Sequence, residues 1–179
     1  MTKSIKLNSG KIISIRKDID AKKKKYWNII RTTNLLSKKE IKNGFRTHDL
    51  KTLYNEIMQM SEKLVYIKGM LFYLNMGETS FNKEEFKKTN NYNIFMACEM
   101  KEAIAQLKMV PVLDPKTKSQ KGLKALGKEE VFTSAKIAAL IKDLQLNANK
   151  YDAAMEKFNN ETEIDLGDTS DEFKNEVAI

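Results

Sequence analysis

The sequence predicts an all-α fold, an elongated helical bundle of about four main helices built on a long antiparallel αα-hairpin. Three observations predict it: a heptad pattern over residues 47–77, a second one near the N-terminus, and few helix-breaking residues. The 179 residues include 2 prolines and 7 glycines, which is few for a turn-rich β fold. Hydrophobic residues make up 41% and charged residues 31%, which favours a narrow core over a thick globule.

The central helix is predicted over residues 47–77, where apolar residues fill every a and d position of four heptads. This heptad stripe consists of Leu50, Leu53, Ile57, Met60, Leu64, Ile67, Leu71 and Leu74. Such a stripe is typical of a helix that packs along another helix, as in a coiled coil. Thr47 is the expected N-cap, and Gly77 supplies the left-handed residue that commonly ends a helix.

A first helix is predicted from about residue 11 to residue 36. Its stripe has the same spacing with two polar members: Ile12, Ile15, Ile19, Lys22, Tyr26, Ile29, Thr33 and Leu36. Residues 4–15 also fit a small β-hairpin, but the helix, with Ser9 as its cap, is favoured because the stripe extends back to Ile12. The short polar connection over residues 37–46 then implies that the first two helices are antiparallel neighbours.

Two further helices are predicted over residues 92–109 and 133–160. A short helix capped by Thr79 or Ser80 precedes a bend near Asn90, and Pro111 ends the third helix. Residues 110–128 show no periodicity and many lysines, and are expected to form a basic loop. Residues 161–179 carry a charge of −6, typical of an acidic tail. We therefore expect one bundle domain over residues 1–160, followed by this tail.

The chain holds one cysteine, Cys98, and one histidine, His48. An internal disulfide and a Cys/His zinc site are therefore excluded, and Cys98 is expected to be a buried, inert thiol. His48 and Asp49 lack the further histidines that a metal-dependent hydrolase would need. No apolar run approaches the ~20 residues of a membrane span, and no signal peptide is visible. We expect a cytoplasmic protein without a membrane partner.

Two short patterns come close to motifs that carry chemistry. Residues 122–128 nearly fit a phosphate-binding loop, but Glu129 stands where a Ser or Thr would hold Mg²⁺. Glu99 and Glu102 share a helix face, but no Glu-x-x-His partner exists for a di-iron site, so both are expected on the solvated surface. The sequence thus predicts no catalytic, cofactor-binding or metal site, and the chain is not expected to be an enzyme.

The net charge of +8 is unevenly distributed, since residues 1–51 hold fifteen Lys or Arg against four acidic residues. Four consecutive lysines at 22–25 precede Tyr26 and Trp27, and Lys22 is expected to point toward the stripe and extend outward along its stem. The functional interpretation is a phosphate-binding face with Trp27 stacking on bases; the alternative is a solvated helix face. The candidate residues for nucleic acid or an acidic partner are Lys22, Lys23, Lys24, Lys25, Trp27, Arg31, Lys116, Lys118, Lys121 and Lys124. In a third interpretation, the acidic tail folds over this face.

Residues 64–76 are apolar well beyond the stripe. Either the third and fourth helices pack there, or a surface is left for a partner or for self-association. The candidate interface residues are Tyr66, Met70, Phe72, Tyr73 and Met76. The first half of the same helix would then project from the bundle as a two-helix arm.

Taken together, these features predict a non-enzymatic helical protein that binds a macromolecule through a basic face and a Met/aromatic patch. Phage- or mobile-element-encoded inhibitors and adaptors that act on a nucleoprotein belong to this class. The expected partner is a protein, a nucleoprotein or a nucleic acid, and no cofactor is expected. The alternative is a structural or assembly protein that forms a homo-oligomer through its heptad stripe.

Overall fold

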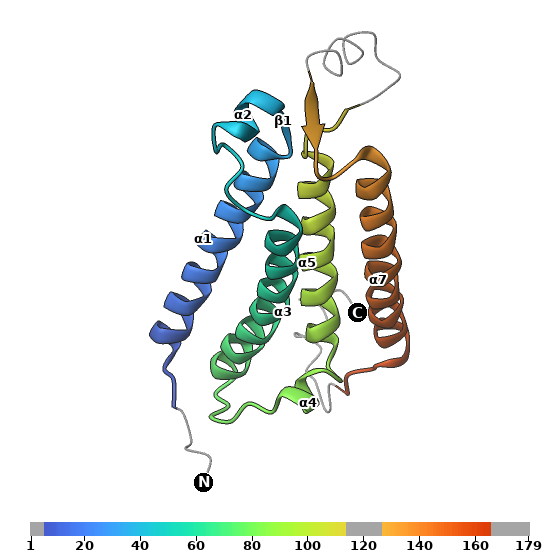
Figure 1. Cartoon of the computed structure of the whole chain (residues 1–179). Coiled ribbons are helices and arrows are strands. Elements are labelled where there is room, and N and C mark those ends of the chain that lie inside the picture. The colour runs from blue at the N-terminus through green and yellow to red at the C-terminus, as the bar shows by residue number, and fades with distance from the viewer. Residues whose placement is uncertain (1–5, 114–126, 166–179) are drawn as a thin grey trace, which may run out of the picture.

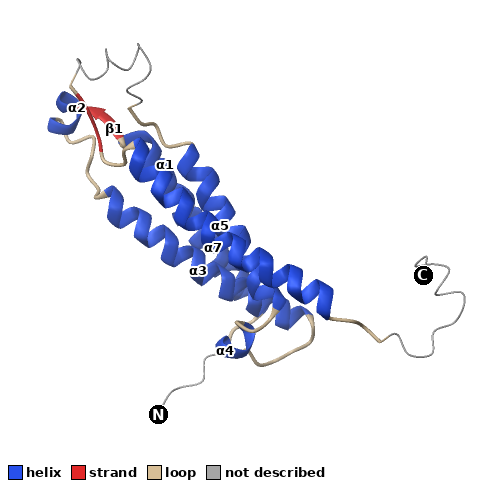
Figure 2. Ribbon diagram, turned by 90° about the vertical axis from the view of Figure 1, so that its right-hand side faces the viewer, coloured by secondary structure: helices blue, strands red, loops and turns tan. Residues whose placement is uncertain are grey.

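Four long helices form the body of the molecule in the computed structural model, which describes residues 6–113 and 127–165. Within those residues the chain runs through these elements: α1 (Ser9–Thr33), β1 (Leu35–Ser37), α2 (Lys38–Lys42), α3 (Leu50–Asn75), α4 (Lys83–Phe86), α5 (Asn90–Lys108), β2 (Lys128–Glu130) and α7 (Ser134–Glu161). The long helices α1, α3, α5 and α7 lie side by side and alternate in direction (Figure 1), and the bundle is elongated along them (Figure 2). The predicted all-α class is confirmed.

The helices begin at short polar side chains that accept backbone hydrogen bonds. Asn8 caps α1 by accepting a hydrogen bond from the Lys11 N–H at 2.9 Å. The N-terminal segment is therefore helical from Ser9 onward, as favoured over the β-hairpin, and its cap lies one residue earlier than the predicted Ser9. Asp49, not Thr47, caps α3. Asn82, rather than Thr79 or Ser80, caps α4. Each of these side chains satisfies an amide that the helix itself leaves unpaired.

The end of α3 follows the prediction. Gly77 has a φ of +84°, and its N–H donates to the Leu74 carbonyl at 3.1 Å. The next amide, that of Glu78, donates to the Tyr73 carbonyl at 3.0 Å. These two bonds are those of a Schellman motif, which needs a left-handed residue and therefore favours glycine.

The connection between α1 and α3 is more ordered than a polar loop. Leu35 of β1 lies opposite Glu130 of β2, and Ser37 lies opposite Lys128, in an antiparallel pair. Leu36 therefore belongs to β1, and α1 ends three residues earlier than predicted. The strand β2 also begins inside the segment 110–128 that was expected to be a basic loop; residues 114–126 of that segment lie outside the described residues.

Asn34 fixes this end of the bundle. Its buried amide nitrogen donates to the carbonyls of Pro111 at 2.8 Å and Phe132 at 3.0 Å, and its Oδ1 accepts from the Phe132 N–H at 2.7 Å. Arg46 donates to the carbonyls of Thr33 and Asn34. These side chains satisfy buried backbone groups that the helices leave free, which explains how short strands persist here.

The main hydrophobic core joins all four long helices. Its buried members include Trp27 and Ile30 of α1, Leu50, Leu53, Ile57 and Met60 of α3, Ala103, Ile104 and Leu107 of α5, and Ile137 and Leu144 of α7. The first half of α3 is thus surrounded by the other helices, and the prediction of a projecting two-helix arm is wrong. In a two-helix arm the stripe would contact only α1, whereas here it also contacts α5 and α7.

For the fourth helix the 3-4 spacing predicts a stripe of Ile137, Leu140, Leu144, Asn147, Tyr151, Ala154 and Phe158, and α7 departs from it. Ile137 and Leu144 are buried as expected, but the next buried residue is Ala148, whereas Asn147 is exposed. A straight α-helix turns once in about 3.6 residues, so its buried face drifts away from a strict seven-residue repeat.

A second core covers the end of α3. Val65, Tyr66 and Phe86 are buried there, packed against Met70, Tyr73, Phe81, Tyr92, Phe95 and Met96. The short helix α4 supplies Phe86, and its ring lies directly over Gly69 of α3. A Cβ atom at position 69 would lie 2.5 Å from Phe86 Cζ, so this approach requires glycine.

We expect Gly69→Ala to lower the free energy of unfolding by about 1–3 kcal/mol, because overpacking outweighs the better helix propensity of alanine. Urea unfolding followed by circular dichroism measures the change. Gly10→Ala in α1 is the matched control, since the nearest atom to its added Cβ is 3.6 Å away. Equal stability of Gly69→Ala and the parent chain would contradict the close packing at Phe86.

Candidate functional site

A buried network of charges links three of the long helices. The Lys23 Nζ of α1 is 2.5 Å from Glu99 Oε2 and 3.0 Å from Glu102 Oε2, both on α5. The other Glu99 oxygen accepts from Lys68 Nζ of α3 at 2.7 Å. The side chains of Lys23 and Glu99 are 3% and 4% exposed. Two lysines and two glutamates make the network neutral, as burial of charge requires.

Glu99 is held in its ionised form. Burial by itself raises the pKa of this carboxyl, but the hydrogen bonds and positive charges of Lys23 and Lys68 outweigh burial and bring the pKa below its ordinary value of 4.5. The expectation that Glu99 lies on the solvated surface is therefore wrong. The signal in the sequence was its spacing from Glu102, which places both carboxylates on one face of α5.

The structure buries a different lysine from the one expected. Lys22 is exposed, with its Nζ 3.7 Å from Glu56 and 5.2 Å from the centre of the Tyr26 ring. The buried face of α1 instead carries Ile12, Lys23, Trp27 and Ile30. Lys23 follows Ile12 by eleven positions, which is close to three full turns of a straight α-helix, so both side chains lie on the same face. A strict seven-residue repeat, as in a coiled coil, places Lys22 on that face instead.

Two of the predicted nucleic-acid contacts are inaccessible. Trp27 is 1% exposed and packs edge-on against Tyr54 with ring centres 6.1 Å apart, so its ring offers no face to a base. Lys23 is occupied by the glutamates. Arg31 is partly buried and donates to Gln106 Oε1 at 2.8 Å. The predicted lysines of the basic loop, Lys116, Lys118, Lys121 and Lys124, lie outside the described residues.

The outer face of α1 keeps its basic character. Lys11, Lys17, Lys24 and Lys25 are exposed, and no ion pair involves them in the part of the chain that the structure describes. We call these four side chains the α1 lysine face. Lys24 and Lys25 belonged to the predicted set, whereas Lys11 and Lys17 were identified only by their exposure.

The predicted Met/aromatic patch is divided. Tyr66 is buried, and Met70 and Tyr73 pack against the second core, so these three are largely internal. Phe72 and Met76 remain on the surface, 37% and 69% exposed. The internal residues are covered by Phe81, by Phe86 of α4 and by Tyr92, Phe95 and Met96 of α5. The third predicted helix therefore packs on this segment as expected, but its partner in the second core is the short helix α4 and not the fourth predicted helix.

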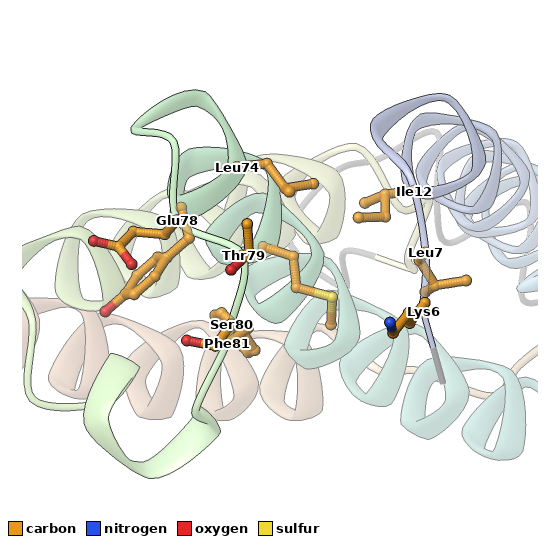
Figure 3. Close-up of a pocket in the computed structure, with 10 residues that line it drawn as sticks. Lys6, Leu7, Ile12, Leu74, Glu78, Thr79, Ser80 and Phe81 are labelled. Carbon is orange, nitrogen blue, oxygen red and sulfur yellow. The ribbon is translucent and has the colours of Figure 1, made fainter. Parts of the chain in front are cut away.

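A groove of about 860 Å³ opens at this end of the bundle. Figure 3 shows Leu7 and Ile12 on one side, Leu74 of α3 across from them, and Thr79 to Phe81 of the α3–α4 connection below. The lining is mainly apolar, with Lys6 and Glu78 at its margins. Nothing in the described chain covers this groove.

Cys98 is exposed, contrary to the expectation of a buried thiol. It lies on α5 between Ala97 and Glu99, which face the interior instead. Among the described residues, no three His, Cys, Asp or Glu side chains gather as metal ligands. None of the described helices has the length and apolar character that crossing a membrane demands.

The fold defines an all-α protein of the helical-bundle class. Comparison of the chain with protein-family models, with curated proteins and with solved structures finds no match.

Proposed function

We propose that this chain is a non-enzymatic binding protein that engages an anionic macromolecule, a nucleic acid or the nucleic-acid component of a nucleoprotein, through the α1 lysine face. The observation that carries the proposal is the exposure of Lys11, Lys17, Lys24 and Lys25 without ion-pair partners in the described chain. Unpaired lysines on one helix attract phosphates and release the counterions bound to them.

The mode of binding follows from what lies beside these lysines. Trp27 is buried and Tyr26 is partly buried. Stacking on bases from α1 is therefore not part of the proposal. Contacts would be made to phosphates, which position a protein on nucleic acid but do not read sequence. We expect little sequence preference and a steep dependence on salt.

An adaptor or inhibitor acting on a nucleoprotein, of the kind that phages and mobile elements encode, is the biological role that we favour. The homo-oligomer alternative has less support, because the stripe residues Leu50, Leu53, Ile57 and Leu64 are buried within one chain. Phe72 and Met76 are exposed at the C-terminal end of α3 and offer a secondary contact for a protein partner.

A triple charge reversal, Lys17→Glu with Lys24→Glu and Lys25→Glu, tests the proposal. We expect roughly tenfold or greater weakening of binding to a fluorescent nucleic acid, together with a shallower salt dependence, because phosphate contacts are lost. Fluorescence anisotropy with single-stranded and duplex oligonucleotides at two salt concentrations measures both quantities.

The matched control carries the same change of net charge on another helix. Lys136, Lys142 and Lys150 of α7 are exposed and take part in no ion pair among the described residues. Their replacement by glutamate should leave affinity nearly unchanged. Equal loss in the two triple variants would assign binding to net charge alone. If the chain binds no nucleic acid but captures a protein from a nuclease-treated lysate, the nucleic-acid proposal fails.

A further inference from the structure

The lysine-rich part of α1 contains one short pattern twice, displaced by a single residue. In each copy a lysine, an aromatic residue and an isoleucine stand at positions i, i+4 and i+7. The first copy is Lys22, Tyr26 and Ile29, and the second is Lys23, Trp27 and Ile30. Each copy lies along one face of a helix, and the two faces differ by a rotation of about 100° about the helix axis. The residue types along α1 therefore fit two rotations of this helix.

The structure buries one copy and leaves the other at the edge of the core. Each member of the copy that contains Lys23 is at most 2% exposed. In the other copy, Tyr26 and Ile29 are partly buried against the main core, and the Lys22 side chain is 54% exposed. One of the two rotations is thus selected.

The apolar members of the pattern do not explain this selection. Each rotation buries one aromatic ring and one isoleucine, so hydrophobic burial differs little between the two. Trp27 Nε1 is buried without a hydrogen-bond partner in the described chain, which costs free energy in the observed rotation. The selection therefore depends on charged groups.

Glu99 needs a lysine from α1. Its two carboxylate oxygens accept from Lys23 of α1 and from Lys68 of α3, and Lys23 also donates to Glu102. Without a lysine from α1, two glutamates would face Lys68 alone, and a buried negative charge would stay uncompensated. The network thus requires that α1 present a lysine at this place.

The other lysines of α1 explain why Lys22 does not fill the place. A rotation that turned Lys22 inward would move Lys25 to the position of the partly buried Tyr26. It would also move Lys11 to the position of the buried Ile12. Burial of these two lysines without partners is unfavourable. The observed rotation leaves both exposed, as members of the α1 lysine face.

We propose that the ion pair between Lys23 and Glu99 is a rotational lock of α1, which holds Lys24 and Lys25 on the outer face. Glu99 acts as a positioning residue, because its ion pairs are with Lys23 and Lys68 and not with the lysines of that face. The consequence for nucleic-acid binding rests on the proposed function, whereas the rotation itself is measured in the free protein.

Trp27 reports the rotation directly, because it is the single tryptophan of the chain. In Lys23→Met, Glu99 regains a partner from α1 when Lys22 turns inward, and this rotation carries Trp27 to the exposed position of Asn28. We expect its emission to shift to longer wavelength and its acrylamide quenching constant to rise severalfold. Lys22→Met makes the same change of charge and should leave Trp27 protected.

Two double variants separate rotation from a general loosening of the core. In Lys22→Met with Lys23→Met, neither copy of the pattern keeps a lysine, so Trp27 should stay protected. In Lys23→Met with Glu99→Leu, the need for a lysine is removed, and Trp27 should stay protected again. Protection of Trp27 in Lys23→Met would overturn the proposal, as would equal exposure in Lys23→Met and in Lys22→Met with Lys23→Met. Loss of the helical circular dichroism of Lys23→Met would overturn it too, since a helix that can recruit Lys22 stays folded.

Nucleic-acid binding by the same two single variants gives an independent result. Lys22 is exposed and Lys23 is buried, so a loss of direct contacts alone would weaken binding more in Lys22→Met. The lock reverses this order, because rotation in Lys23→Met turns Lys25 away from the outer face. If the parent chain binds no nucleic acid while Trp27 responds as expected, the proposed function fails and the lock stands.

Discussion

Glu99→Gln is expected to lower the free energy of unfolding by about 3 kcal/mol. The substitution keeps the size of the side chain but removes the charge that faces Lys23 and Lys68. Lys23 is almost fully buried and cannot turn toward water, so loss of one partner leaves a poorly compensated charge. Urea unfolding at neutral pH gives the change directly.

Two comparisons separate this effect from a general loss of ion pairs. Lys101→Ala breaks an exposed pair with Asp152 and should cost less than about 1 kcal/mol. The free energy of unfolding should fall less in the double variant Lys23→Met with Glu99→Leu than the sum of the falls in Lys23→Met alone and Glu99→Leu alone. The double variant removes both charges together, whereas each single variant leaves one buried charge without its partner. Additive losses would show that Lys23 and Glu99 are not coupled.

The stabilisation that Glu99 provides, measured as the difference between the parent chain and Glu99→Gln, is expected to depend on pH. The pKa of Glu99 is lower in the folded chain than its ordinary value of 4.5. Its contribution to stability is therefore fully present above that ordinary value and is lost as the pH falls through the folded pKa. The difference in free energy of unfolding between the parent chain and Glu99→Gln should therefore decrease as the pH is lowered from 4.5 through the folded pKa of Glu99. A gap that stays constant would contradict the ionised state of Glu99.

Phe86→Ala is expected to lower the free energy of unfolding by about 3–5 kcal/mol, the range for removing a buried phenylalanine. Phe86 is fully buried, and its ring centre lies 5.3–6.4 Å from those of Tyr66, Tyr73, Phe81, Tyr92 and Phe95. No other side chain of α4 is buried, so its removal detaches this element from α3.

Thermal and urea unfolding measure this loss, and the near-ultraviolet circular dichroism of the tyrosines reports the second core. Phe158→Ala is the control, because that ring is largely exposed on α7 and should contribute less than about 1 kcal/mol. If Phe86→Ala were no more destabilising than Phe158→Ala, the second core would not depend on α4.

The basic face was only partly predictable. Lysine-rich composition identified α1 as the candidate helix, and Lys24 and Lys25 are indeed exposed. The same reasoning gave Trp27 a functional role, whereas the structure places it in the main core. A run of lysines beside an aromatic residue does not reveal which side of the helix faces inward.

The sequence by itself determined the features that depend on neighbours along the chain. The stripe from Leu50 to Ile67 and the left-handed Gly77 both follow from local spacing and backbone chemistry. Tertiary structure decided which residue meets which across the bundle. Lys23, and not Lys22, is buried and forms an ion pair with Glu99. The strands β1 and β2 pair beside Asn34, whose side chain binds the backbone of Phe132. Spacing along the chain predicts a helix and its caps, but not how far the helix is rotated about its own axis. That rotation decides which side chains meet between helices, and it is fixed only by the packing of all four helices against one another.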